Sequence, residues 1–220
     1  MMKLPENYTV LFKNVKNVGI RVSHDQRVRI VAPKWLPERH LEDILKKRED
    51  WIQKHLQRLR TRKQPVALAD NQMLLKGKIF HLEYHAQFNH SIEIDEEHLV
   101  IRASDLFSEK PHQLAWYKNE AKKYLERRVQ DLSVRYGFHY NKLFIRSQKT
   151  RWGSCSKRKN LSFNWKLIKT PLFVIDYLIL HELVHTECMN HSKQYWQKVR
   201  SLCPEHKTAS QWLKDHGGEL

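Results

Sequence analysis

Cysteine is scarce in this sequence, and long apolar runs are missing. The 220 residues include three cysteines, Cys155, Cys188 and Cys203. An odd and widely spaced set does not fit the disulfide framework of a small secreted protein, and it favours reduced thiols in the cytosol. No stretch approaches the roughly 20 apolar residues of a membrane span, and no signal-like apolar run follows the first charge. We therefore expect a soluble, cytoplasmic protein with no membrane partner.

Acidic residues are also under-represented. The chain has 40 Lys and Arg against 24 Asp and Glu, a formal net charge of +16. Such a surface attracts polyanions, including nucleic acid. The same charge fits a basic surface that is merely solvated, because the cations are spread along the chain and form no single block. Charge alone therefore predicts no function.

The first half of the chain indicates a β-rich N-terminal domain over residues 1–108. Residues 8–32 alternate roughly between apolar and polar, which is typical of short strands. Apolar residues at helical spacing predict one helix from Glu38 to about Arg62. Further strands are expected over residues 74–88 and 91–103, the first with a turn at Gly77.

The second half predicts a separate domain over residues 109–220. Pro111 opens a helix that Gly137 ends. Residues 143–168 indicate two strands around a polar turn. Residues 172–185 form an apolar run long enough for a buried helix, and a short helix precedes Gly217. The fold class is therefore mixed α+β.

The sequence His-Glu-Leu-Val-His at 181–185 carries the main chemical signal. On a helix, positions i and i+4 differ by about 40° of rotation, so His181 and His185 can reach one metal ion. Glu182 lies beside them, close enough to hold a water on that metal. Two ligands and a general base on one helical turn are typical of zinc peptidases.

A catalytic zinc usually has three protein ligands and one open position. His191 is the favoured third ligand, since a bend at Met189-Asn190 would return it over the metal; Asn tolerates the left-handed conformation well. Cys188 is a rival, but three ligands on one straight helix would spread over about 10 Å. An acidic residue from elsewhere remains a third alternative.

A five-residue match of this kind also occurs by chance. Here the first histidine follows the apolar run "VIDYLIL". A buried helix that carries several titratable groups would be costly without a metal to satisfy them. Burial and the third histidine together favour a metal site.

Three segments resemble the YgjP-like metallopeptidase family, which is of the zincin type and akin to the SprT-like proteases. They are "TRWGSCSKRKNLSFNWKLIKTP", "VIDYLILHELVH" and "MNHSKQYW". The similarity extends upstream through "VRIVAPKWLP", "REDWIQKH" and "LKGKIFHLEY", and ends with "CPEHKTASQWLKDHG". It covers nearly the whole chain.

The resemblance implies a small N-terminal mixed sheet with one helix, then a zincin-like domain whose His-Glu-x-x-His helix lies beside a small antiparallel sheet. It implies a zinc-dependent peptidase with ligands His181, His185 and His191 and with Glu182 as base. Zinc would activate a water and polarise the scissile carbonyl of a peptide or unfolded protein substrate. The alternative is a nucleic-acid-associated protein, such as a protease acting on DNA-bound proteins. The sequence gives no oligomeric state.

Two further features are left open by the sequence. Arg151, Tyr195 and His206 are candidates for stabilising the oxyanion or contacting substrate. The turn "RWGSCS" either reaches the metal site or simply packs Trp152 into the core, and an exposed edge strand nearby could pair with an extended peptide. Cys155 fits a buried small residue better than a reactive thiol.

Overall fold

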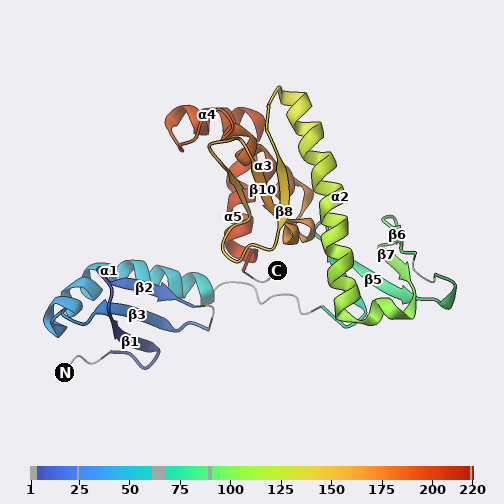
Figure 1. Ribbon diagram of the computed structural model, residues 1–220. Coiled ribbons are helices and arrows are strands. Elements are labelled where there is room, and N and C mark those ends of the chain that lie inside the picture. The colour runs from blue at the N-terminus through green and yellow to red at the C-terminus, as the bar shows by residue number, and fades with distance from the viewer. Residues whose placement is uncertain (1–3, 24, 61–67, 89–90, 219) are drawn as a thin grey trace. The chain divides into compact units, whose positions relative to one another are not determined.

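The computed structural model describes residues 4–23, 25–60, 68–88, 91–218 and 220. Its backbone forms two compact units, Met1–Gln64 and Pro65–Leu220, here called the N-terminal and C-terminal units (Figure 1). Both mix helices with small sheets, so the predicted α+β class is confirmed. Within the described residues, no helix is both long and apolar enough to cross a bilayer.

The N-terminal unit packs one helix on one sheet. Its elements are β1 (Tyr8–Lys13), β2 (Gly19–Val22), β3 (Val28–Pro33) and α1 (Glu38–Arg60). The strand order is β1-β3-β2, with β3 parallel to β1 and antiparallel to β2. The alternation in β3 buries Val28 and Ile30 against Leu41 and Ile52 of α1. The predicted pattern of strands followed by an amphipathic helix is confirmed here.

The C-terminal unit begins with a four-stranded sheet of order β4-β5-β7-β6. Its strands are β4 (Gln72–Leu75), β5 (Lys78–Tyr84), β6 (Glu93–Asp95) and β7 (Val100–Ala103), with short 3-10 turns at Ala86–Phe88 and Asp105–Ser108. The β4–β5 turn docks on later residues: the Lys76 and Gly77 amides donate to the carbonyls of Ile168 and Lys169, at 2.7 and 3.1 Å.

This docking bears on the division of the chain. The core of the β4–β7 sheet is continuous with that of the helices that follow it. The division between the compact units follows Gln64, and the domain boundary expected between residues 108 and 109 stays a prediction. The N-terminal half also holds two sheets, where the sequence suggested a single one.

The rest of the C-terminal unit surrounds a buried helix. Its elements are α2 (Lys110–Tyr136), β8 (Leu143–Arg146), β9 (Gly153–Cys155), β10 (Leu161–Asn164), a 3-10 turn (Trp165–Lys169), α3 (Leu172–Val184), α4 (Lys193–Leu202) and α5 (His206–His216). Gly137 caps α2 with a φ of 72°, as predicted. Arg128 of α2 forms a two-bond ion pair with Asp176 of α3, both at 2.7 Å.

The sheet beside α3 is mixed. β10 lies between β8 and β9, antiparallel to β9 as predicted and parallel to β8. Three strands form where two were expected, because residues 147–160 give the long connection that lets β8 lie parallel to β10. Helix α4 was not predicted as an element.

Candidate metal centre

Three histidine side chains converge at the end of α3. His181 lies in the last turn, His185 caps the helix, and His191 precedes α4. The Nε2 atom of His191 lies 3.2 Å from Nε2 of His185 and 3.3 Å from Nε2 of His181. The sequence-predicted set is thus brought together, with ligand atoms within 4.8 Å of one another.

These distances fit a tetrahedral metal site. Zinc–nitrogen bonds of about 2.0–2.1 Å at tetrahedral angles place two ligand nitrogens about 3.3–3.4 Å apart. Both measured separations lie close to that value. Within the described residues, neither Cys188 nor a carboxylate belongs to the convergent group.

Neighbouring groups fix the orientation of the rings. Nδ1 of His185 lies 2.9 Å from the carbonyl oxygen of Cys188, so its N–H donates there and Nε2 keeps a free lone pair. Tyr195 stacks on His185 with ring centroids 4.5 Å apart, and its hydroxyl donates to the His181 carbonyl at 3.1 Å. Trp196 stacks on His191 at 5.6 Å.

Burial favours the neutral, metal-binding form of His181 and His185. It lowers the pKa of His181 to about 3, with further lowering by His185 and His191. Burial also lowers the pKa of His185, and His191 adds to that effect. Nδ1 of His181 is buried and has no hydrogen-bond partner among the described residues.

The chain reverses without the left-handed Asn190 that the sequence suggested. Asn190 is not among the residues with positive φ in the described chain. The turn forms earlier, where the Cys188 amide donates to the Val184 carbonyl at 2.9 Å. The Cys188 carbonyl then accepts from His185, so Cys188 contributes to the site through its backbone.

Glu182 lies in a buried niche made by β9. Glu182 is only 5% exposed. A Cβ atom on Gly153 would lie 2.8 Å from Glu182 Oε1 and 2.9 Å from its Cγ, so only glycine leaves room for this carboxylate. Burial raises the pKa of Glu182 to about 7, against the lowering effects of Arg151 and of the Cys155 backbone N–H, which donates to the carboxylate.

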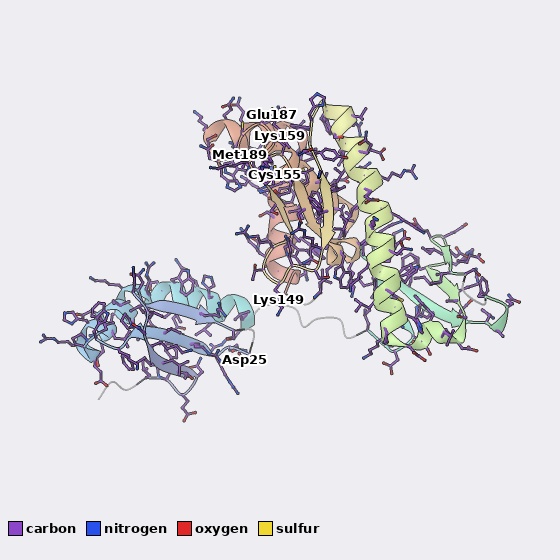
Figure 2. All side chains as sticks on the ribbon, viewed as in Figure 1. Asp25, Lys149, Cys155, Lys159, Glu187 and Met189 are labelled. Atoms are coloured by element: carbon purple, nitrogen blue, oxygen red, sulfur yellow. The ribbon has the colours of Figure 1, made fainter. Side chains whose placement is uncertain are left out.

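The turn "RWGSCS" therefore reaches the site through Gly153 and Cys155. Sequence reasoning did not single out Gly153; the available signal was a glycine inside a strand, which often marks a close approach. Cys155 is half-buried, and burial followed by the charge of Glu182 raises the pKa of its thiol to about 11. That shift disfavours the reactive thiolate. The side chains of this region, including Cys155, Glu187 and Met189, are drawn in Figure 2.

The chain matches a known family over most of its length. The model of the YgjP-like metallopeptidase domain matches residues 16–216. The chain belongs to this family. Its members are metallopeptidases, and the resemblance predicted from the sequence is confirmed.

Two solved structures are similar to part of the chain. One is the metallopeptidase zymogen abylysin of Pyrococcus abyssi, at 20% identity and a TM-score of 0.37, over 41% of this chain and 92% of that one. The other is the zymogen jannalysin of Methanocaldococcus jannaschii, at 21% identity and a TM-score of 0.33, over 40% and 93% of the two chains. No curated protein matches the chain.

The three candidate oxyanion or substrate contacts of this YgjP-like chain lie in different surroundings. Arg151 is exposed and acts electrostatically on Glu182. Tyr195 is fully buried with its hydroxyl engaged by the backbone. His206 is buried, and its Nδ1 lies 3.1 Å from the Cys203 carbonyl oxygen.

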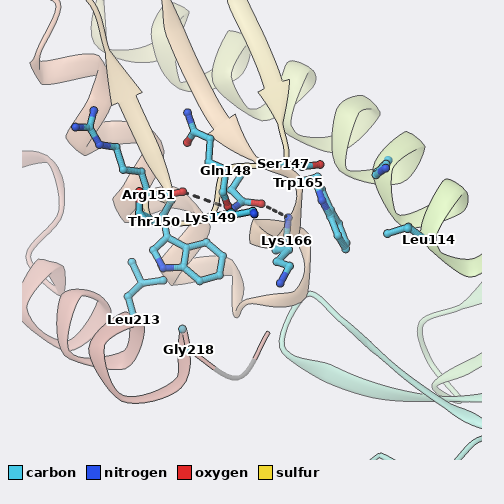
Figure 3. A pocket seen from close by; sticks show the side chains of 14 residues that line it. Leu114, Ser147, Gln148, Lys149, Thr150, Arg151, Trp165, Lys166, Leu213 and Gly218 are labelled. Atoms are coloured by element: carbon cyan, nitrogen blue, oxygen red, sulfur yellow. Dashed lines mark hydrogen bonds between the residues drawn. The ribbon is translucent and has the colours of Figure 1, made fainter. Parts of the chain in front are cut away.

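Two of these candidates, Arg151 and His206, each line a cavity. The first, of about 650 Å³, contains Arg151 and lies at the start of β9, with Trp165, Lys166 and Leu213 among its walls (Figure 3). The second, of about 530 Å³, contains His206 and is lined by α4 and α5.

Proposed function

We propose that this chain is a zinc metallopeptidase in which His181, His185 and His191 hold the metal and Glu182 is the general base. The observation that carries the proposal is the convergence of three imidazoles, in which Nε2 of His191 lies at tetrahedral spacing from Nε2 of both His181 and His185. A buried carboxylate on the adjacent helical position supports it. The family supports peptide-bond hydrolysis as the reaction.

The chemistry divides between metal and protein. Bound zinc supplies a Lewis acid that makes water more acidic and polarises a carbonyl group. Glu182 accepts the proton of the attacking water and passes it to the leaving amine. Burial raises the pKa of Glu182, while Arg151 and the Cys155 N–H favour the ionised form that starts the reaction.

The other candidates have different roles in this proposal. Arg151 is our choice for contact with the oxyanion or the substrate, since it combines exposure with proximity to Glu182. Tyr195 positions the ligands through its stack on His185 and its bond to His181. β9 is an edge strand of its sheet, and an extended peptide could pair with it through main-chain hydrogen bonds. The substrate would be a peptide or an unfolded protein.

The test uses Glu182→Gln, which keeps the size of the side chain and removes the base. We expect bound zinc to remain at one per chain while hydrolysis of a denatured protein falls by at least 100-fold. His185→Ala is the matched control and should lose both zinc and activity. Wild-type protein without zinc, or a fully active Glu182→Gln variant, would contradict the proposal.

A cytoplasmic location and an association with nucleic acid, both expected from the sequence, remain proposals. The three free cysteines are consistent with a cytoplasmic setting. Association with nucleic acid, including action on DNA-bound proteins, is motivated by the net charge of +16. An affinity for duplex or single-stranded DNA that falls steeply with salt would support it, and no measurable binding at low salt would exclude it.

A further inference from the structure

The cavity between α4 and α5 is strongly basic. Its walls are Lys193, Trp196, Arg200, His206, Lys207, Ser210, Gln211 and Lys214. Four of these residues are cations and none is a carboxylate. Across the residues that the structure describes, none of the four cations forms an ion pair. Four cations around one concavity create a potential that favours an anionic ligand, and the carboxylate of Asp215, which accepts from the wall residue Gln211, offsets only part of it.

One wall of this cavity belongs also to the metal centre. The Trp196 ring stacks on His191 with centroids 5.6 Å apart and an angle of 25° between planes. The same ring lies 6.3 Å from the ring of His206. An extended peptide spans about 3.3–3.6 Å per residue, so a group bound in the cavity lies a few residues from a peptide bond held at the histidines.

The cavity that Arg151 lines has a similar character. Its lining includes the four cations Lys118, Lys149, Arg151 and Lys166 and no acidic residue (Figure 3). One cationic cavity thus shares Trp196 with the metal centre, and the other includes Arg151, which acts electrostatically on Glu182. A substrate segment that occupies either one meets positive charge.

We propose that the α4–α5 cavity is a subsite for carboxylate side chains, so that the enzyme selects acidic segments of its peptide substrates. The inference rests on the proposed peptidase function and names its substrate class. A peptide is favoured over nucleic acid because the family acts on peptide bonds and the cavity shares Trp196 with the metal centre. A volume of about 530 Å³ accommodates one or two carboxylate side chains.

The test compares two fluorescent peptides that differ only in three Glu-to-Gln replacements. Binding is measured by anisotropy on full-length Glu182→Gln protein, and kcat/KM on wild type. We expect the acidic peptide to bind at least tenfold more tightly and to be cleaved at least tenfold more efficiently, with the preference shrinking at high salt. The double variant Lys207→Gln/Lys214→Gln should lose most of this preference.

The matched control is Lys122→Gln/Lys123→Gln, which makes the same change of net charge at exposed positions on α2. It should retain the preference. Equal binding of the two peptides would overturn the inference, as would equal losses in both double variants. Displacement of the acidic peptide by a short single-stranded oligonucleotide at lower concentration than by unlabelled peptide would also overturn it, in favour of a nucleic-acid site.

The experiment separates a failure of the proposed peptidase function from a failure of the proposed acidic preference. If wild type and Glu182→Gln hydrolyse the peptides equally, the peptidase mechanism is wrong whatever the binding result. If Glu182→Gln is inactive but the two peptides behave alike, the peptidase stands and the acidic preference is wrong.

Discussion

Gly153 is the residue on which the placement of the proposed base depends most closely. Its missing side chain leaves the space that the carboxylate of Glu182 fills. The spacing His-Glu-x-x-His predicts Glu182 and two histidines because those residues share one helical turn. The contact between Gly153 and Glu182 crosses from a strand to a helix, and no local periodicity encodes it.

Gly153→Ala should therefore reduce activity without removing the metal. The new Cβ would lie 2.8 Å from Oε1 of Glu182, so the carboxylate must shift. A displacement of this order costs about 10- to 100-fold in kcat. Steady-state kinetics and zinc analysis on the same sample check this, with Gly19→Ala, whose added Cβ meets nothing within 4 Å, as control. An unchanged kcat would show that the space beside Gly153 does not determine the position of the Glu182 carboxylate.

Tyr195→Phe tests the role of the buried hydroxyl. The change removes the bond to the His181 carbonyl and keeps the stack on His185. Loss of such an outer-sphere partner should weaken zinc binding by about tenfold, as measured by competition with a chelator. Tyr140→Phe, which loses a hydroxyl bonded to Gln130, is the control and should bind zinc like wild type. If Tyr195→Phe instead kept its zinc affinity and lost kcat, the hydroxyl would act on substrate.

At the scale of elements, the β4–β5 hairpin packs against the residues that precede α3. Gly77 has a φ of +77°, and a Cβ there would lie 2.7 Å from Cα of Pro171. The turn at Gly77 was predictable from sequence, whereas its docking on residues 168–171 was not. Helix α4 escaped prediction because it is short and begins directly after the ligand loop, where Ser192 accepts a hydrogen bond from the Tyr195 amide.

Gly77→Ala should destabilise the C-terminal unit. Both the left-handed backbone and the close approach to Pro171 oppose a side chain, and we expect a loss of about 1–3 kcal/mol in the free energy of unfolding. Urea denaturation followed by tryptophan fluorescence measures it. A loss no greater than that of Gly19→Ala would show that the hairpin does not need this contact.

At the scale of the whole molecule, the division of the chain follows its cores and not its composition. Residues of β4, β5 and β7 share a core with α2 and α3, while the core of the N-terminal unit is separate. The sequence placed the boundary near residue 108 because the strands end there and the long helix begins. A boundary set by shared burial is not visible in local periodicity.

A fragment of residues 68–220 should therefore fold and bind zinc as the whole chain does. A fragment of residues 109–220 should not fold cooperatively, because it exposes the apolar surface that Met73, Phe80 and Ile101 cover. The two fragments are compared by thermal unfolding, followed by circular dichroism, and by their zinc stoichiometry. Cooperative unfolding of the shorter fragment would instead support the domain boundary predicted near residue 108.

The most direct test of the account is X-ray absorption spectroscopy at the zinc edge on protein as purified. We predict one zinc per chain with three imidazole nitrogens at about 2.0–2.1 Å and a light-atom fourth ligand. A sulfur ligand at about 2.3 Å would contradict it and bring Cys188 into the ligand set. Protein that binds no zinc at all would contradict its central claim.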